Sequence, residues 1–295
     1  MATPSTNSPV QEIKERSLWR DALRNFFKNR LAIFGLVIVS IFLVFALFAE
    51  ILAPFPYEKS VLAETLQFPS TEHWLGTDQI GRDLLSRIIY GSRISLLVGF
   101  SVQFFAFAVG VPLGAIAGLR GGWVDLVVTR VIEIMTAFPS FLFAIFLMSI
   151  LGTGVFNVIL AISVTSWIEV CRLTRAQFIS LREREYIVAA NSYGSTDWRI
   201  IVRHILPNAL PPLIIMFALG IPSAIFAEAG LSFLGVGIND PLPSWGKMVG
   251  MSMGYLNVYW HMGIFPTITI ALAMLSFNFL GDGIRDAIDP TMYNK

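Results

Sequence analysis

Few side chains in this sequence are placed to make or break bonds. The three histidines, His73, His204 and His261, lie far apart along the chain, and no HExxH zinc pattern occurs. We therefore expect no metal site built on histidines. Ser232 and His261 are the best candidates for an intramembrane serine protease, but two residues without a third partner make a weak catalytic constellation. We expect no catalytic residue in this chain.

Nucleotide chemistry is not predicted either. A phosphate-binding loop ends in Gly-Lys followed by serine or threonine, whereas Gly246 and Lys247 precede Met248. The chain is therefore not expected to hydrolyse ATP. Its only cysteine, Cys171, excludes an intramolecular disulfide. A formal net charge of +1 also lacks the basic excess of a nucleic-acid binder. The informative residues are those suited to binding another protein.

The segment 169–207 has the pattern of a protein-docking hairpin. Two helical runs are separated by Gly194, a residue suited to the left-handed backbone conformation that ends a helix. Pro207 is expected to end the second run. The second run carries an apolar stripe, with arginines on its other face, at Trp198, Ile201, Val202 and Ile205. Such a hairpin is built to enter a groove on another protein.

The elements that would position this hairpin are apolar runs. Hydrophobic residues make up 55% of the chain and charged residues only 14%, where soluble proteins carry about 25% charge. A transmembrane helix needs about 20 apolar residues. The runs that meet or approach this length are 31–52, 94–117, 124–151, 155–168, 210–229 and 260–280, the fourth being cut short by Glu169. We expect an all-α membrane protein with six transmembrane helices.

Charge sets the orientation of these six predicted spans. Arginines and lysines concentrate in the arm 1–30 and in the segment 169–207. The basic residues assigned to the other side fall mostly in one long loop, and long loops weigh less in the positive-inside rule. Both termini are therefore expected on the cytoplasmic side.

The predicted spans hold little that could couple transport to an ion gradient. Most of their length carries no Asp, Glu, Lys or Arg, whereas ion-driven transporters commonly place such groups near the midplane. A secondary transporter is therefore the remote alternative, and the energy source is expected outside this chain. Helix-bending candidates that could line a cavity, or could simply reflect how common proline is in membrane helices, are Pro112, Pro139, Pro222 and Pro266.

The hairpin resembles a known motif. Ala189, Ala190, Gly194 and the closing Leu206–Pro207 have the spacing of the EAA loop of ABC importer permeases, with Val188 where that pattern has glutamate. Three further segments, 75–99, 227–246 and 281–290, resemble the DppC/OppC branch of peptide permeases and occur in the same order. The resemblance covers nearly everything from about Arg20 onward.

This resemblance implies the type I ABC importer permease fold in a bacterial inner membrane. It implies a homologous second permease forming a heterodimer, two cytoplasmic ATPase subunits that hold ATP and Mg²⁺, and an external substrate-binding protein. The cargo would be dipeptides or oligopeptides, with nickel or another small solute as the alternative. The residues it implies for ATPase coupling are Val188, Ala189, Ala190, Gly194, Trp198, Ile205, Leu206 and Pro207.

The expected organisation has four parts. A cytoplasmic arm (1–30) precedes the first span and an outer loop with an interfacial amphipathic helix (31–93). A five-helix core (94–281) contains the coupling loop 169–207, and a cytoplasmic tail (282–295) follows. Trp245, in the outer loop after the fifth span, is expected at the membrane interface.

Overall fold

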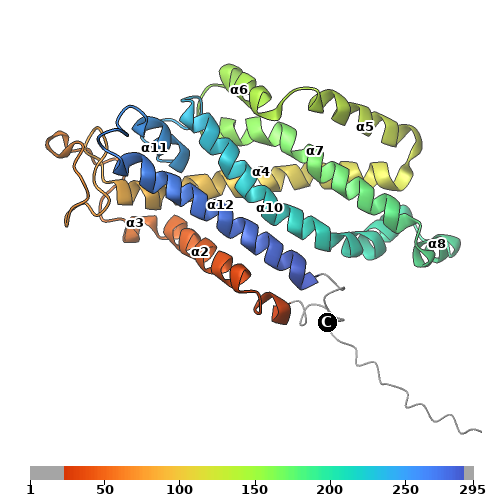
Figure 1. Cartoon of the computed structure of the whole chain (residues 1–295). Helices are drawn as coiled ribbons and strands as arrows, with labels where there is room; N and C mark the ends of the chain where they lie inside the picture. Colours follow the sequence, from red (N-terminus) through yellow and green to blue (C-terminus); the bar gives the residue numbers. More distant parts are fainter. Residues whose placement is uncertain (1–22, 289–295) are drawn as a thin grey trace, which may run out of the picture.

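The computed structural model describes residues 23–288, whose regular structure is almost entirely helical (Figure 1). Most of the predicted arm 1–30 and the end of the predicted tail 282–295 lie outside the described residues. The body is formed by the long helices α2 (Arg30–Leu47), α4 (Leu84–Arg120), α7 (Val155–Arg182), α10 (Leu206–Phe233) and α12 (His261–Ile288). The all-α prediction is confirmed.

Each of these helices is long and apolar enough to cross a bilayer, with α10 continued on its N-terminal side to Trp198. A sixth crossing comes from α5 (Gly122–Thr136) and α6 (Ser140–Leu151), which are bent by 80° at a short break. The described residues thus contain five candidate spans, or six if the bent pair counts as one. Exposed side chains such as Phe34, Phe104 and Phe146 suit contact with lipid tails.

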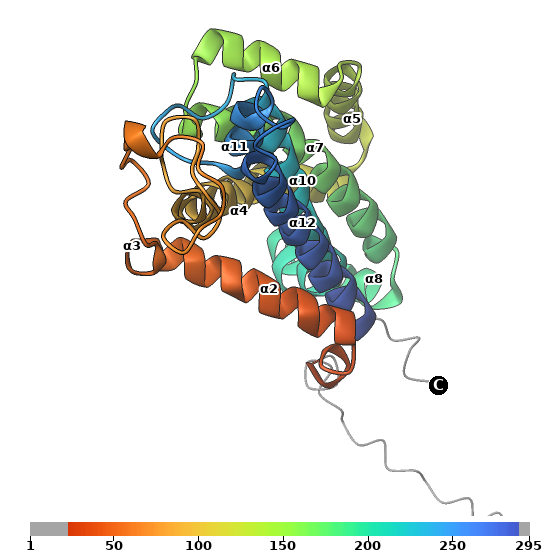
Figure 2. The ribbon, with the colours of Figure 1, turned by 60° about the vertical axis from the view of Figure 1, so that its left-hand side comes forward.

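The start of α2 and the end of α12 lie side by side at one end of the bundle (Figures 1 and 2). Asn29 caps α2 by accepting hydrogen bonds from the backbone N–H groups of Leu31 and Ala32. Its side-chain amide also donates to Asp286 near the end of α12, at 3.2 Å. The two ends of the described chain therefore reach the same side of the bundle, as an even number of spans requires.

Helices α4 and α7 pack with their backbones in close contact. Gly110, Gly114 and Gly118 recur every four residues and remove the side chains from one face of α4. A Cβ atom on Gly114 would lie 2.5 Å from the carbonyl oxygen of Cys171, and one on Gly118 would lie 2.7 Å from the Cβ atom of Phe178. Small residues permit this approach, which van der Waals contact stabilises in lipid.

The outer segment differs from its prediction. It contains the short helices α3 (Ala49–Leu52) and η1 (Leu62–Glu64), but no separate interfacial helix precedes the second span within the described residues. Helix α4 instead begins at Leu84, ten residues before the predicted start at 94. The supposed polar face, which includes Arg82, Asp83 and Arg87, is buried. The prediction was wrong because those charged groups pair within the protein rather than facing water or headgroups.

Three predicted helix limits are also corrected. The run 124–151 is not one straight helix, because the chain breaks between Thr136 and Ser140, where Pro139 stands. Glu169 ends the apolar run but not the helix, since α7 continues to Arg182. The last helix, α12, extends to Ile288, so the predicted tail begins inside it.

The hairpin consists of α8 (Glu185–Ser192), Gly194 and α9 (Asp197–Ile200). A π-helical turn, η2 (Ile201–Ile205), joins α9 directly to α10. Pro207 therefore does not end a helix, and it lies in the first turn of α10 directly after the π-helical turn. The second arm of the hairpin and the fifth span form one continuous helical element.

Trp245 is not an interface anchor. It begins α11 (Trp245–Ser252) and is fully buried among α4, α10 and α12. Its indole N–H donates to the carbonyl of Ile88 at 3.1 Å. Gly91 of α4 faces the ring, because a Cβ atom there would lie 2.9 Å from it. The interface prediction failed because the indole finds its polar partner on α4 rather than at the membrane surface.

We expect Gly114→Val to lower the stability of the solubilised protein by about 1–3 kcal/mol, because the added atoms must push α4 away from α7. Thermal unfolding in detergent, followed by tryptophan fluorescence, measures this effect. Gly254→Val is the control, since no atom lies within 4 Å of a Cβ built on Gly254. Equal unfolding temperatures for Gly114→Val and the unmodified protein would contradict the close-packing account.

Candidate functional site

The hairpin is anchored to the spans by buried isoleucines. Ile187 of α8, Ile200 of α9 and Ile205 of η2 are at most 1% exposed. They pack in one cluster with Phe178 of α7 and Leu213 of α10. Burial of three such side chains contributes several kcal/mol, at roughly 1.5–3 kcal/mol each. The hairpin is therefore a firm extension of α7 and α10.

Gly194 gives the hairpin its turn. Its φ of 75° lies in the left-handed region, as the sequence pattern predicts. The N–H of Ser195 donates back to the carbonyl of Ala190 at 3.1 Å, which closes the end of α8. No atom lies within 4 Å of a Cβ built on Gly194. The backbone conformation, rather than lack of space, demands glycine here.

The residues predicted for ATPase coupling divide into two groups. Those on the outside of the hairpin are Val188, Ala189, Gly194 and Trp198, and Trp198 is 73% exposed. Ala190 lies next to the turn, where its carbonyl accepts a hydrogen bond from Ser195, and those at the base are Ile205, Leu206 and Pro207, of which Ile205 is buried. Tyr193, which the sequence reading missed, is 91% exposed beside Gly194. Exposed aromatic side chains of this kind are typical of protein contacts.

A pocket of about 500 Å³ lies at the base of the hairpin, where α4, α7 and α8 meet. Its lining includes Arg182, Glu183 and Val188. Arg182 is held in place because its guanidinium donates to the carbonyl of Gly118 at 2.9 Å. The hairpin therefore presents exposed apolar and aromatic side chains next to a hollow with positioned charges.

A second cavity, of about 900 Å³, lies among α4, α7, α10 and the bend between α5 and α6. Pro139 stands at this bend and lines the cavity. The other three proline candidates, Pro112, Pro222 and Pro266, lie inside single continuous helices and outside the cavity lining. Of the four, only Pro139 combines a sharp bend with a place in the cavity wall.

Hydroxyl groups from α5, α7 and α10 line this cavity. Ser166 donates to the carbonyl of Ile162 at 2.8 Å, and Ser223 donates to that of Leu219 at 3.4 Å. Because these hydrogens are engaged by their own helices, the oxygens remain free to accept hydrogen bonds from a solute. The charged lining residues lie in the second half of α7 and the last turns of α12 and are Glu169, Arg172 and Arg285.

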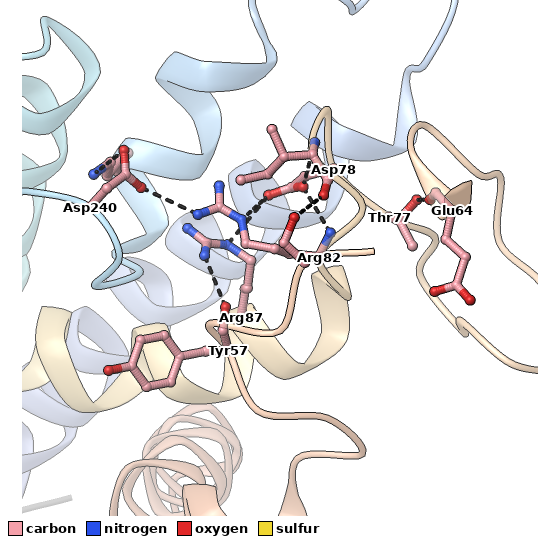
Figure 3. Close-up of polar contacts among 10 residues, drawn as sticks. Tyr57, Glu64, Thr77, Asp78, Arg82, Arg87 and Asp240 are labelled. Atoms are coloured by element: carbon pink, nitrogen blue, oxygen red, sulfur yellow. Dashed lines mark hydrogen bonds and ion pairs between the residues drawn. The ribbon is translucent and has the colours of Figure 1, made fainter. Parts of the chain in front are cut away.

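The opposite end of the bundle is closed by buried ion pairs (Figure 3). Asp78 accepts a hydrogen bond from Nε of Arg82 at 2.6 Å, and both side chains are at most 6% exposed. Arg82 also reaches Asp240 at 3.3 Å, while Arg87 donates to the carbonyl of Tyr57 at 3.3 Å. These contacts join the outer segment, the start of α4 and the loop after α10 into what we call the outer cap.

Asp240 connects this cluster to α11. Lys247 of α11 lies 3.2 Å from its carboxylate. Burial alone would raise the pKa of Asp240, but the contacts with Lys247 and Arg82 outweigh it and hold the pKa below its ordinary value. Burial lowers the pKa of Lys247, against the pull of the Asp240 carboxylate.

Glu228 is a buried acid that the sequence reading did not single out. It lies fully buried in α10 and accepts hydrogen bonds from Ser232 at 2.7 Å and from Ser95 of α4 at 3.2 Å. The four-residue spacing of Glu228 and Ser232 could have indicated their contact, because residues i and i+4 of a helix lie on the same face. The hydroxyl of Ser232 is therefore engaged by Glu228. No hydrogen bond joins Ser232 to His261 in the described part of the chain. The protease alternative therefore has no geometry to support it.

Comparison with known families decides the identity of the chain. Residues 110–293 match the family described as "Binding-protein-dependent transport system inner membrane component". Residues 17–69 match the N-terminal TM domain of oligopeptide transport permease C. The chain belongs to this permease family. The resemblance to its DppC/OppC branch is confirmed, and the chain is a multi-pass inner membrane transport component.

Several curated relatives resemble this permease over nearly its whole length. The dipeptide transport system permease protein DppC of Alkalihalophilus pseudofirmus is 44% identical, over 99% of this chain and 97% of that one. OppC of Bacillus subtilis is 39% identical over 95% and 92%. The glutathione transport system permease protein GsiD of Pectobacterium atrosepticum is 37% identical over 96% and 94%.

The fold also matches a solved structure. An inward-facing MetNI methionine ABC transporter chain superposes with a TM-score of 0.57 at 20% identity, covering 70% of this permease and 98% of that chain. At this identity the match concerns the fold alone. It confirms the predicted type I ABC importer permease fold.

We expect Arg82→Gln to destabilise the permease by about 3–5 kcal/mol, because it removes the shortest charged contact of the buried Asp78 carboxylate and leaves it only Arg87, at 3.8 Å. Arg130→Gln is the matched control. Arg130 pairs with Glu133 at 2.5 Å, but both side chains are at least 50% exposed, so its loss should cost no more than about 1 kcal/mol. Chemical unfolding of the solubilised protein compares the two, and equal losses would contradict the assignment of the outer cap.

Proposed function

We propose that this permease is the DppC/OppC-type membrane subunit of an ATP-driven bacterial importer of dipeptides and longer peptides. The printed names of its relatives support this cargo, since dipeptides, oligopeptides and glutathione are all peptidic. The cavity of about 900 Å³ is within the range of pockets that enclose small solutes. Nickel is less favoured, because the cavity lining contains no histidine or cysteine.

One observation carries the mechanism: the hairpin and the cavity wall share a continuous helical element. The chain is helical from Asp197 through η2 and α10 to Phe233. Trp198 lies exposed at the hairpin end, and Ser223 lines the cavity on the same element. A force applied to the hairpin by a docked partner would therefore move one wall of the cavity directly.

The partners follow from this arrangement. We assign the exposed hairpin face to one of two cytoplasmic ATPase subunits, on which ATP and Mg²⁺ would bind. A homologous second permease would complete the translocation path, and an external substrate-binding protein would deliver the peptide at the outer cap. ATP-driven closure of the ATPases would favour one facing of the cavity, because a ligand shifts an equilibrium only through its differential affinity for the two states.

The cavity chemistry suits a peptide in transit. Serine and threonine oxygens can accept hydrogen bonds from peptide N–H groups, while phenylalanine, isoleucine and methionine side chains line the remaining wall. The charged lining residues lie toward the hairpin end rather than across from Gln103 and Ser223. Weak, side-chain-tolerant contacts allow a solute to enter and also to leave.

We expect Gly194→Val to abolish peptide uptake and cargo-stimulated ATP hydrolysis while the permease still inserts and assembles. A β-branched residue is strained at a φ of 75°, although there is open space around the site. Gly194→Asn is the control, because asparagine tolerates the left-handed conformation. Uptake and ATPase rates of the reconstituted complex measure both variants. Full coupling in Gly194→Val would contradict the role of the hairpin.

We expect Ser223→Leu to lose most of its peptide uptake, because the larger side chain fills the cavity and removes an acceptor. Ser149→Leu on α6 is the matched control, since Ser149 is also exposed and bonds to its own helix but does not line the cavity. Transport of labelled dipeptide into proteoliposomes measures the difference. Equal uptake by both variants would place the path elsewhere.

A further inference from the structure

Three potential metal-binding side chains converge in the outer segment, apart from the cavity and the hairpin. They are Glu64 at the end of η1, Glu72, and His73. One ligand atom of each lies within 4.8 Å of those of the other two. Glu64 and Glu72 reach solvent, whereas His73 is only 3% exposed. The cluster therefore has a buried base and an open side.

Asp83 determines which nitrogen of His73 carries a proton. Nδ1 of His73 lies 2.9 Å from the Oδ1 atom of Asp83, and a carboxylate can only accept a hydrogen bond. Nδ1 must therefore be the protonated nitrogen, which leaves Nε2 with a free lone pair in the neutral ring. A carboxylate that holds the far nitrogen of a histidine in this way is the usual second shell of a metal ligand.

Nε2 of His73 has no hydrogen-bond partner within the described residues. It lies 3.4 Å from the Oε2 atom of Glu64, longer than a charge-assisted hydrogen bond of about 2.7–2.9 Å. Two acceptors that face each other at this distance repel unless a proton or a metal cation lies between them. A tetrahedral Zn²⁺ with ligand distances of about 2.0–2.2 Å would separate its nitrogen and oxygen ligands by roughly 3.4 Å.

The surrounding structure holds the His73 ring and the backbone of Glu64 in place, and within the described residues it leaves the Glu64 carboxylate without a basic partner. In Figure 3 the carboxylate of Glu64 points away from the arginines of the outer cap, while its backbone carbonyl accepts a hydrogen bond from Thr77. No lysine or arginine pairs with Glu64 in the part of the chain that the structure describes. The ring of Phe55 packs against His73 with the centroids 5.0 Å apart. Preorganisation of this kind is what a metal site requires.

We propose that Glu64, Glu72 and His73 bind a divalent transition-metal cation such as Zn²⁺ at the outer face of this permease. One imidazole nitrogen and two carboxylates suit zinc better than calcium or magnesium, which prefer oxygen ligands alone. The cation would tie η1 to the turn before α4, because Asp83 both orients His73 and caps α4 through Ser86 at 2.7 Å. The bound cation would stabilise the outer cap. It would have no direct contact with the ATPase or with the cavity.

The test is zinc binding by the purified permease complex, without nucleotide or external binding protein, after chelator treatment and dialysis. Titration calorimetry with ZnCl₂ and metal analysis should find a site that Glu72→Gln weakens at least about tenfold, because a ligand is lost. Glu72 is exposed, so this variant should fold normally. His73→Gln should lose the same site, and Zn²⁺ should raise the unfolding temperature of the unmodified complex but not of Glu72→Gln.

Glu58→Gln is the matched control, because Glu58 is an exposed carboxylate of the same outer segment that lies outside the cluster. It should bind zinc as the unmodified complex does. Equal zinc stoichiometry and affinity in Glu72→Gln, His73→Gln and the unmodified complex would overturn the proposal. Absence of zinc binding at micromolar concentration would also overturn it. Neither outcome depends on peptide uptake, so the proposed function is tested separately.

Discussion

The close backbone contact between α4 and α7 is the constraint on which the rest of the permease depends. In a bilayer, apolar side chains gain little by leaving lipid for protein, so helices must be held by dense packing and by hydrogen bonds. Gly110, Gly114 and Gly118 allow carbonyls of α7 to approach within the space a side chain would fill. This contact runs toward the hairpin end, where Phe178 joins the cluster that anchors the hairpin. The cavity wall and the hairpin thus share one scaffold.

The two ends of the bundle are held together by different kinds of contact. At the outer end, Asp78, Arg82, Glu228 and Trp245 are buried, and the last three bond to segments far apart in sequence. Removing one partner would leave a buried polar group unsatisfied, so this end resists rearrangement. At the hairpin end, contacts are mainly apolar, and exposed aromatic groups surround Gly194. This difference between the two ends agrees with the proposed mechanism, in which a partner protein acts on the hairpin end.

The sequence predicted the helices better than their ends. Hydropathy located the spans because lipid demands long apolar runs, and Gly194 marked the hairpin because few other residues adopt its backbone conformation. Glu169 and Pro207 were misread as boundaries, since a helix can carry a charge into the interface or a proline in its first turn. The pattern at Arg82 and Arg87 was read as amphipathic because the contacts of Arg82 with Asp240 and of Arg87 with the carbonyl of Tyr57 cannot be recognised from local spacing.

By itself the sequence determined the fold class, the family resemblance and the position of the hairpin, because each rests on composition or on spacing within a short segment. Only the tertiary structure decided which proline bends a wall of the cavity, which charges are buried, and that Glu64 and His73 meet. Those features depend on how the segments fold against one another, which local sequence patterns do not specify. Packing, rather than any local preference, sets that arrangement.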